Sequence, residues 1–206
     1  MPTIAITGAA GKTGRVVAQH FLDHDYTVVP IDSAGLPGRY GDLSRQLGVG
    51  LVRADLTDYG QTVDVLRGAD AVVHLAAIPA PGLYPDSTTF HQNSAMNYNV
   101  FAAAQLHAIS PVVWTSSETT FGLPFDTPPL YAPIDEDHYP YPTSTYALSK
   151  VVGETLAQHF AQWSGGTFIA LRISNVHVAA DYAAVPGYQQ DFALRRWNLW
   201  GYVDAR

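Results

Sequence analysis

Tyr146 and Lys150 are the two residues whose types and spacing most directly suggest proton-transfer chemistry. They lie four residues apart in a segment with helical periodicity, so both side chains are expected on one face, one turn apart. A free tyrosine, with a pKa of about 10, is a poor base at neutral pH. A neighbouring ammonium group favours the phenolate and should lower that pKa. Ser117 follows a predicted strand and could hydrogen-bond the oxygen of a reacting hydroxyl or carbonyl group.

A glycine-rich segment near the N-terminus could hold an anionic cofactor. It follows a predicted strand, opens a predicted helix and reads Gly8-Ala9-Ala10-Gly11-Lys12-Thr13-Gly14. Gly8 permits a tight turn, Gly11 lets the backbone approach a pyrophosphate, and Gly14 lets the helix pack close to the strand. The N–H groups at a helix N-terminus favour the same anion. The segment therefore predicts a dinucleotide-binding turn, with Ala10, Lys12 and Thr13 as further contacts.

Asp32 ends the second predicted strand, 18 residues past Gly14. A carboxylate there accepts hydrogen bonds from the adenosine ribose hydroxyls and repels a 2′-phosphate, which favours NAD over NADP. Arg39 lies in the following loop and could reach a phosphate, so NADP stays open as an alternative.

The elements that must position these residues alternate along the chain. Predicted strands cover residues 4–7, 27–31, 49–53, 71–75, 112–115 and 167–173, and predicted helices cover residues 12–23, 59–66, 87–109 and 144–163. This alternation predicts an α/β fold, a Rossmann-type doubly wound parallel sheet covered by helices on both faces.

Four polar residues fall at or just after predicted strand ends, where such sheets bind ligands. They are Asp32, Asp55, Ser117 and Asn175. In the last predicted helix, an apolar stripe recurs every four residues at Leu148, Val152, Leu156 and Phe160.

Composition narrows the class of protein. The chain has 206 residues, a net charge of -7 and only 11 basic residues, which argues against nucleic-acid binding. It has no cysteine, so disulfides and thiolate chemistry are excluded. The eight histidines show no metal-ligand spacing, and we expect no metal site. With no signal peptide and no apolar run of about 18 residues, we expect a cytoplasmic protein without a membrane span.

The ordered motifs together resemble the extended short-chain dehydrogenases/reductases, in particular the NAD-dependent epimerase/dehydratase group. The matching segments are residues 7–14 (TGAAGKTG), Asp32, Asp55-Leu56, residues 74–77 (HLAA), Asn93, residues 115–117 (TSS), residues 146–150 (YALSK) and residues 171–176 (LRISNV). This resemblance covers essentially the whole chain.

The resemblance implies a role for each matching position. Tyr146 is the implied acid/base, Lys150 lowers its pKa and holds the nicotinamide ribose, and Ser117 orients the substrate. Asn175 would touch the substrate. The implied cofactor contacts also include Asp55 and Leu56 at the adenine, Leu75, Ala76 and Ala77 along the cofactor, and Asn93, which would support the lysine through water.

The function expected from the residues and the resemblance is NAD-dependent hydride transfer to or from a hydroxyl-bearing carbon of a sugar or nucleotide sugar. Sugar-nucleotide dehydratases of this family carry Thr-Asp-Glu where this chain has Ser117-Glu118-Thr119, so a dehydratase is disfavoured. An epimerase and a dehydrogenase both stay open. The alternatives are a non-catalytic NAD(P)-binding module or sensor, and an NADP-linked reductase of a small carbonyl compound.

The C-terminal part differs most from the family pattern. We expect residues 1–174 to form the NAD-binding domain with its catalytic helix, and residues 175–206 to begin a small substrate-binding lobe. Residues 200–206 resemble a strand that leads into a further stretch in relatives, so we expect that lobe to be incomplete and the chain truncated. Relatives commonly pair the two long helices between subunits, so the resemblance implies a homodimer.

Overall fold

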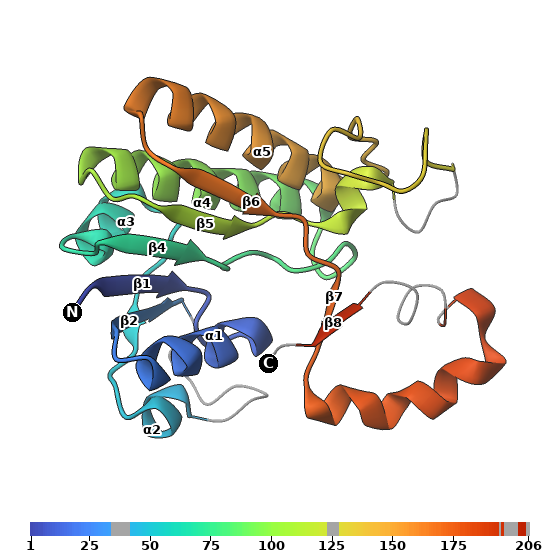
Figure 1. Cartoon of the computed structure of the whole chain (residues 1–206), viewed down its shortest axis with the longest axis horizontal. Coiled ribbons are helices and arrows are strands. Elements are labelled where there is room, and N and C mark those ends of the chain that lie inside the picture. The colour runs from blue at the N-terminus through green and yellow to red at the C-terminus, as the bar shows by residue number, and fades with distance from the viewer. Residues whose placement is uncertain (34–41, 123–127, 194, 196–201, 205–206) are drawn as a thin grey trace.

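A six-stranded parallel sheet forms the centre of the computed structural model, which describes residues 1–33, 42–122, 128–193, 195 and 202–204 (Figure 1). Its strands are β1 Thr3–Thr7, β2 Thr27–Asp32, β3 Val52–Arg53, β4 Ala71–His74, β5 Val112–Thr115 and β6 Phe168–Leu171. Their order is β3-β2-β1-β4-β5-β6, and all neighbours are parallel. The strand order reverses between β1 and β4, so the carboxyl ends of these strands are where such sheets bind ligands.

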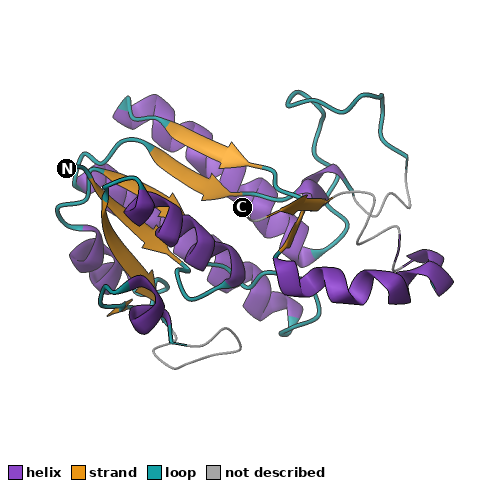
Figure 2. Cartoon of the chain, turned by 60° about the horizontal axis from the view of Figure 1, so that its bottom comes forward, coloured by secondary structure: helices purple, strands orange, loops and turns teal. Residues whose placement is uncertain are grey.

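Helices cover both faces of this sheet (Figure 2). They are α1 Lys12–Asp23, α2 Leu43–Leu47, α3 Tyr59–Leu66, α4 Asp86–Leu106 and α5 Thr145–Ser164. Ile4 and Ile6 of β1 pack with Ala18 of α1, in a cluster that includes Leu43 of α2. Ala5, between them, packs in the larger cluster that contains residues of α3, α4 and α5. Because successive strand residues point to opposite faces, this division confirms the predicted doubly wound architecture.

A second, two-stranded sheet lies beyond the carboxyl ends of the main strands (Figure 1). It pairs β7 Asn175–His177 with β8 Tyr202–Asp204, and the 3-10 helix η2 Ala179–Gln190 lies between them in sequence. The strand predicted within residues 200–206 is therefore present at residues 202–204. The division at residue 174 stays a prediction.

The structure corrects several predicted elements. The third and sixth strands are shorter than predicted, at Val52–Arg53 and Phe168–Leu171. The helix α2 was not predicted, because it has only five residues and no detectable period. Both ends of α2 are nevertheless set by neighbouring residues. The Asp42 side chain accepts a hydrogen bond from Arg45 N, and Gly48 ends the helix in the left-handed conformation.

The apolar stripe of α5 does not coincide with the buried face of this helix. Leu148 is 42% exposed, whereas Phe160 is buried. The buried face instead combines small and polar residues with the aromatic ones, namely Tyr146, Ala147, Ser149, Lys150, Gly153, Ala157 and Phe160. Small residues are needed there because α5 packs closely on α4 and β5: a Cβ at Gly153 would lie 2.5 Å from Asn97 Nδ2. The side chains of Tyr146 and Lys150 therefore lie on the buried face of α5.

Candidate active site

The glycine-rich turn connects β1 to α1 and packs against the residues that follow β4. Gly8 has φ +69°, and a Cβ there would lie 2.7 Å from Ala76 N. A Cβ at Gly14 would overlap the Gly8 carbonyl, so α1 can start only where glycine stands. Gly11 is the N-cap of α1 and forms no side-chain cap hydrogen bond. The first N–H groups of α1 therefore have no side-chain acceptor from their cap, which fits a turn that holds a pyrophosphate.

Asp32 lies beside this turn, as predicted from its position at the end of β2. Its Oδ2 accepts a hydrogen bond from Ala10 N at 3.0 Å. Because the carboxylate is held at the strand end next to the cofactor turn, it is placed to accept ribose hydroxyls. Arg39, the residue that kept NADP open, lies outside the described residues.

Lys12 directs its side chain toward the C-terminal segment. Its Nζ donates to Asp181 Oδ2 at 2.7 Å and to the carbonyl oxygen of Val176 at 3.0 Å. The same Asp181 carboxylate accepts Val178 N, and these contacts hold its pKa below the usual range, with the Lys12 hydrogen bond as the largest cause. Lys12 thus ties the cofactor turn to the strand that begins with Asn175, the predicted substrate contact.

A buried chain of hydrogen bonds runs from β1 through β4 to α4. Thr7 Oγ1 accepts Leu75 N at 3.2 Å and Ala76 N at 3.3 Å, so its proton goes to His74 Nδ1 at 2.6 Å. His74 must therefore carry its own proton on Nε2, which donates to Asn97 Oδ1 at 3.1 Å. This chain holds the Leu75–Ala76 backbone against the glycine-rich turn. Burial, followed by the charge of Lys150, lowers the pKa of His74 to about 3.

Three other predicted cofactor contacts follow β3 or lie in α4. Asp55 Oδ1 accepts both Thr57 N and Thr57 Oγ1, while Leu56 is buried in the main hydrophobic cluster. Asn93 binds both backbone groups of Ile78, and its Nδ2 also donates to Ser149 Oγ at 3.3 Å. Asn93 thereby fixes the backbone just after Ala77. The water-mediated support of Lys150 by Asn93 stays a prediction.

Tyr146 and Lys150 lie on the buried face of α5, one turn apart. The helix begins there because Ser144, its N-cap, accepts a hydrogen bond from Ala147 N. Lys150 Nζ lies 5.6 Å from the centroid of the Tyr146 ring and donates to the carbonyl oxygen of Thr115 at 2.8 Å. The last residue of β5 therefore fixes the ammonium group beside the tyrosine.

The predicted lowering of the Tyr146 pKa is wrong for the protein without its cofactor. Burial raises the pKa of Tyr146 above its usual value, a hydrogen bond from Ser117 opposes this rise, and the charge of Glu118 adds to it. Burial also lowers the pKa of Lys150 to about 8, and its Nζ donates to the Thr115 carbonyl oxygen. The four-residue spacing of Tyr146 and Lys150 gave no information on how deeply the two side chains are buried.

Ser117 lies at the end of β5, where it caps the 3-10 helix η1 Glu118–Phe121. Its Oγ accepts a hydrogen bond from Thr119 N at 3.2 Å and another from Thr119 Oγ1 at 2.9 Å. Its side chain also lies close enough to Tyr146 of α5 to lower the pKa of that tyrosine. The structure therefore brings together Ser117, Tyr146 and Lys150, which are separated by up to 33 residues in the sequence.

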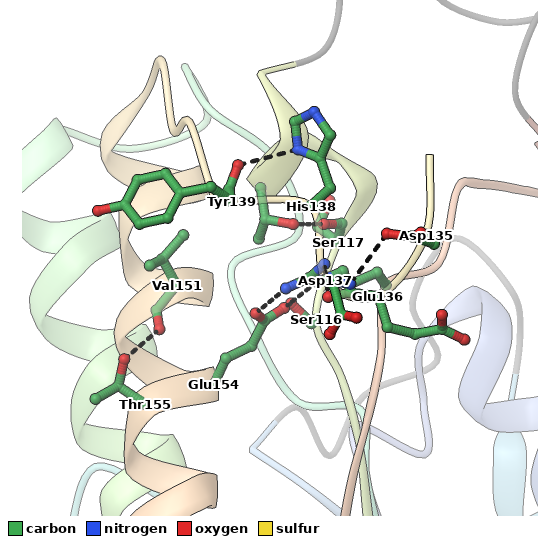
Figure 3. A network of polar contacts seen from close by, with 12 residues as sticks. Ser116, Ser117, Asp135, Glu136, Asp137, His138, Tyr139, Val151, Glu154 and Thr155 are labelled. Carbon is green, nitrogen blue, oxygen red and sulfur yellow. Dashed lines mark hydrogen bonds and ion pairs between the residues drawn. The ribbon is translucent and has the colours of Figure 1, made fainter. Parts of the chain in front are cut away.

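A second network of polar contacts, which the sequence did not predict, holds Ser116, the neighbour of Ser117 (Figure 3). Glu154 of α5 accepts the Ser116 hydroxyl and forms a bidentate ion pair with Arg172, at 2.8 and 2.9 Å. Arg172 also donates to the Glu136 carbonyl oxygen and lies 4.6 Å from the centroid of the Phe121 ring. One feature of the sequence could have pointed to this network. Glu154 comes four residues after Lys150 and so lies one turn further along the same helix.

The loop before α5 is held over this network by a buried histidine. His138 Nε2 accepts Leu130 N at 3.1 Å, and its Nδ1 donates to the Tyr139 carbonyl oxygen at 3.0 Å (Figure 3). Its ring packs edge-to-face on Phe121. The described part of this loop, residues 128–142, is thus fixed by the contacts of His138.

The chain belongs to the NAD dependent epimerase/dehydratase family, whose sequence profile matches residues 4–184. It is 33% identical over 181 residues to L-arabinose 1-dehydrogenase (NAD(P)(+)) of Haloferax volcanii, covering 84% of this chain and 66% of that protein. It is 27% identical to UDP-glucose 4-epimerase of Corynebacterium glutamicum, covering 84% of this chain and 51% of that protein.

Solved structures with the same fold include one that contains the cofactor. A short-chain dehydrogenase/reductase superfamily protein from Agrobacterium tumefaciens with bound NAD superposes with a TM-score of 0.73 and 27% identity, over 94% of this chain and 55% of that one. NAD is the cofactor of this family. The chain spans about half to two thirds of the length of these relatives.

Two features are absent from the described residues. None of the described helices is long and apolar enough to cross a membrane. Within the same residues, no three histidine, aspartate or glutamate side chains are grouped so that they could hold a metal ion.

Proposed function

We propose that this protein transfers hydride between NAD and a hydroxyl-bearing carbon of a sugar or nucleotide sugar. The observation that carries the proposal is the buried cluster of Ser117, Tyr146 and Lys150 near the carboxyl end of β5, in the same sheet whose β1 leads into a glycine-rich turn that fits a dinucleotide. NAD, when bound, accepts or returns the hydride. The protein supplies Tyr146 for the proton and Ser117 for a hydrogen bond to the reacting oxygen.

Lys150 serves this chemistry as a positive charge and as a ribose contact. Its pKa of about 8 leaves most of the molecules with a charged ammonium group at neutral pH. The carbonyl of Thr115 holds that group near the Tyr146 ring. Because burial and the charge of Glu118 raise the pKa of Tyr146, we propose that the positive nicotinamide of NAD is needed to bring the phenolate into the working range.

The relatives support a sugar as the substrate and leave two reaction types. The first is the oxidation of a free sugar, as in the L-arabinose dehydrogenase, and the second is epimerisation of a nucleotide sugar, as in the UDP-glucose epimerase. Both use the same proton and hydride transfers at one carbon. They differ in whether the hydride is returned to the substrate.

A panel of sugars with NAD tests the proposal. We would measure NADH absorbance with L-arabinose, glucose 6-phosphate and uronates, and epimer formation with UDP-glucose, for the wild type and Tyr146→Phe. The wild type should turn over at least one substrate, and Tyr146→Phe should lower kcat by at least about a hundredfold. Binding of NAD without turnover of any substrate would favour the non-catalytic binding module instead.

Calorimetry with NAD and NADP separates the cofactor alternatives. Asp32 beside the Ala10 backbone should make NAD the tighter ligand, because a 2′-phosphate would meet the carboxylate. Clearly tighter NADP binding, together with reduction of a small carbonyl compound, would support the NADP-linked reductase.

We also propose that the protein is a homodimer that pairs α4 and α5 between subunits. Leu148 on α5 supports this, since this apolar residue is 42% exposed in the described chain. Light scattering after size exclusion tests it, and Leu148→Glu should give a monomer if the proposal is right.

A further inference from the structure

We propose that Lys12 is a positioning residue, whose side chain holds β7 and the start of η2 against the glycine-rich turn. Its charge then neutralises Asp181 rather than the pyrophosphate of the cofactor. The sequence had placed Lys12 among the cofactor contacts. This inference deepens the proposed function and rests on it, because β7 begins with Asn175, the expected substrate contact.

Two acceptors of the C-terminal segment bind the ammonium group of Lys12. Its Nζ donates to Asp181 Oδ2 at 2.7 Å and to the Val176 carbonyl oxygen at 3.0 Å. The side chains of Lys12 and Asp181 are only 29% and 27% exposed, so solvent screens this ion pair less than it screens a pair on the open surface. The pair therefore joins the first residue of α1 to a segment near the other end of the chain.

Asp181 is itself fixed within its own segment. Its carboxylate also accepts Val178 N at 2.9 Å, while Asp181 N donates to the Val178 carbonyl oxygen at 2.8 Å. The hydrogen bond from Lys12, followed by the one from Val178, holds the pKa of Asp181 below its ordinary value, so the carboxylate is charged at neutral pH. Lys12 thus binds a full negative charge around which the start of η2 is folded.

Apolar packing contributes little to the position of this segment. The helix η2 has 12 residues, and none of them is buried. In β7, Asn175 and Val176 are half-buried, and His177 is buried. Because little apolar surface is removed from water here, polar contacts must supply much of what holds the segment in place. Lys12 supplies two of them from the cofactor turn.

The ion pair also changes what Lys12 offers to a bound dinucleotide. An ammonium group paired with a carboxylate adds no net charge to the anion site, so the pyrophosphate is left to the backbone N–H groups of the turn and of α1. Loss of Lys12 alone would leave Asp181 as an unpaired carboxylate near this turn and would weaken NAD binding by repulsion. Loss of both charges would not have this effect.

A double-mutant cycle on NAD affinity separates neutralisation of Asp181 from direct binding of the pyrophosphate. Calorimetry compares Lys12→Met, Asp181→Asn and the double variant; asparagine keeps an oxygen for Val178 N and removes only the charge. We expect Lys12→Met to weaken NAD binding by about tenfold, and the double variant to bind within about threefold of the wild type. A double variant that binds NAD as weakly as Lys12→Met would overturn the inference, since Lys12 would then bind the cofactor directly.

Hydrogen exchange without NAD measures the positioning itself. Lys12→Met should speed amide exchange in residues 175–181 by at least about tenfold, because a charged hydrogen-bonded pair is lost, while Lys12→Arg should stay near the wild-type rates. Arg15→Met is the matched control, since it removes a cation of the same helical turn that donates to the Ala10 carbonyl oxygen and to Gln46. Equal exchange of residues 175–181 in Lys12→Met and Arg15→Met would overturn the inference.

Asp181→Asn covers the case in which Lys12→Met does not fold. It breaks the same ion pair from the other side and leaves the glycine-rich turn unchanged, so it should speed exchange of the same amides. The amides of β1 and β4 report in each variant whether the main domain stays folded. Wild-type exchange of residues 175–181 in Asp181→Asn would contradict a segment held by this pair.

Turnover on the sugar panel keeps the two proposals distinguishable, since neither calorimetry with NAD nor exchange needs a sugar. For a sugar that the wild type converts, Lys12→Met should raise KM by at least about threefold with little change in kcat, because Asn175 is displaced and Tyr146 is not. An unchanged KM would overturn the positioning of the substrate contact. Faster exchange and a restored NAD affinity, without turnover of any sugar by the wild type, would support the positioning and refute the proposed function. Turnover by the wild type with equal exchange in Lys12→Met and Arg15→Met would do the reverse.

Discussion

His74 should make the protein lose stability as the pH falls from 7 to 5. Burial lowers the pKa of His74 from 6.5 to about 3, and the charge of Lys150 adds to this effect. Between these two values the unfolded chain binds a proton that the folded chain does not bind. The free energy of unfolding therefore falls as the pH falls through this window, and the effect is absent above the unfolded pKa.

The magnitude follows from the two pKa values. With about 1.4 kcal/mol per pKa unit, linkage gives a loss of about 2 kcal/mol between pH 7 and pH 5 from His74 alone. The structural cause is that neither ring nitrogen can accept a further proton without loss of a hydrogen bond. Nε2 already carries one, and protonation of Nδ1 would displace the proton donated by Thr7.

Urea unfolding at both pH values measures this loss. His74→Gln should lose about 2 kcal/mol less than the wild type on acidification, whatever its stability at pH 7. His91→Gln, which changes an exposed histidine of α4, should behave like the wild type. An equal loss in His74→Gln and the wild type would refute the reasoning.

NMR of the wild type covers the case in which His74→Gln does not fold. The imidazole ¹⁵N signals of His74 should show a proton on Nε2 and should not titrate down to pH 5. A His74 signal that titrates near its ordinary pKa in the folded protein would contradict the buried, neutral imidazole.

Three further substitutions test the packing, the ion pair and the cofactor contact. Gly153→Ala should cost about 1–3 kcal/mol of unfolding free energy, because its Cβ would lie 2.5 Å from Asn97 Nδ2; unchanged stability would contradict this packing. Arg172→Met should cost about 3 kcal/mol by leaving the half-buried Glu154 carboxylate without its bidentate partner, and a second change, Glu154→Leu, should recover much of that loss in urea unfolding. Asp32→Ser should weaken NAD binding by about tenfold in calorimetry and improve the relative affinity for NADP, and an unchanged ratio would argue against a ribose contact.

The glycine-rich turn, the strand ends and the α/β class could be predicted from the sequence because each depends on neighbouring residues. Gly8 and Gly14 adopt a conformation or a packing distance that only glycine allows, so their positions carry the geometry directly. The helices α1 and α3 match their predicted bounds, since their periodicity and ends are local. The short α2 and the ordered loop over residues 128–142 lacked such a pattern.

By itself, the sequence determined which residues could do chemistry, namely Ser117, Tyr146 and Lys150, and the cofactor for which their family is built. Only the tertiary structure decided how these groups behave. In the folded protein α5 is oriented so that Lys150 donates to the Thr115 carbonyl oxygen. Burial raises the pKa of Tyr146, whereas the spacing of the two residues alone predicted a lower pKa. The fold also brought an aspartate of the C-terminal segment onto Lys12. Desolvation and the partners of a charged group depend on what the rest of the chain packs around that group, and neighbouring residues in a sequence do not record that.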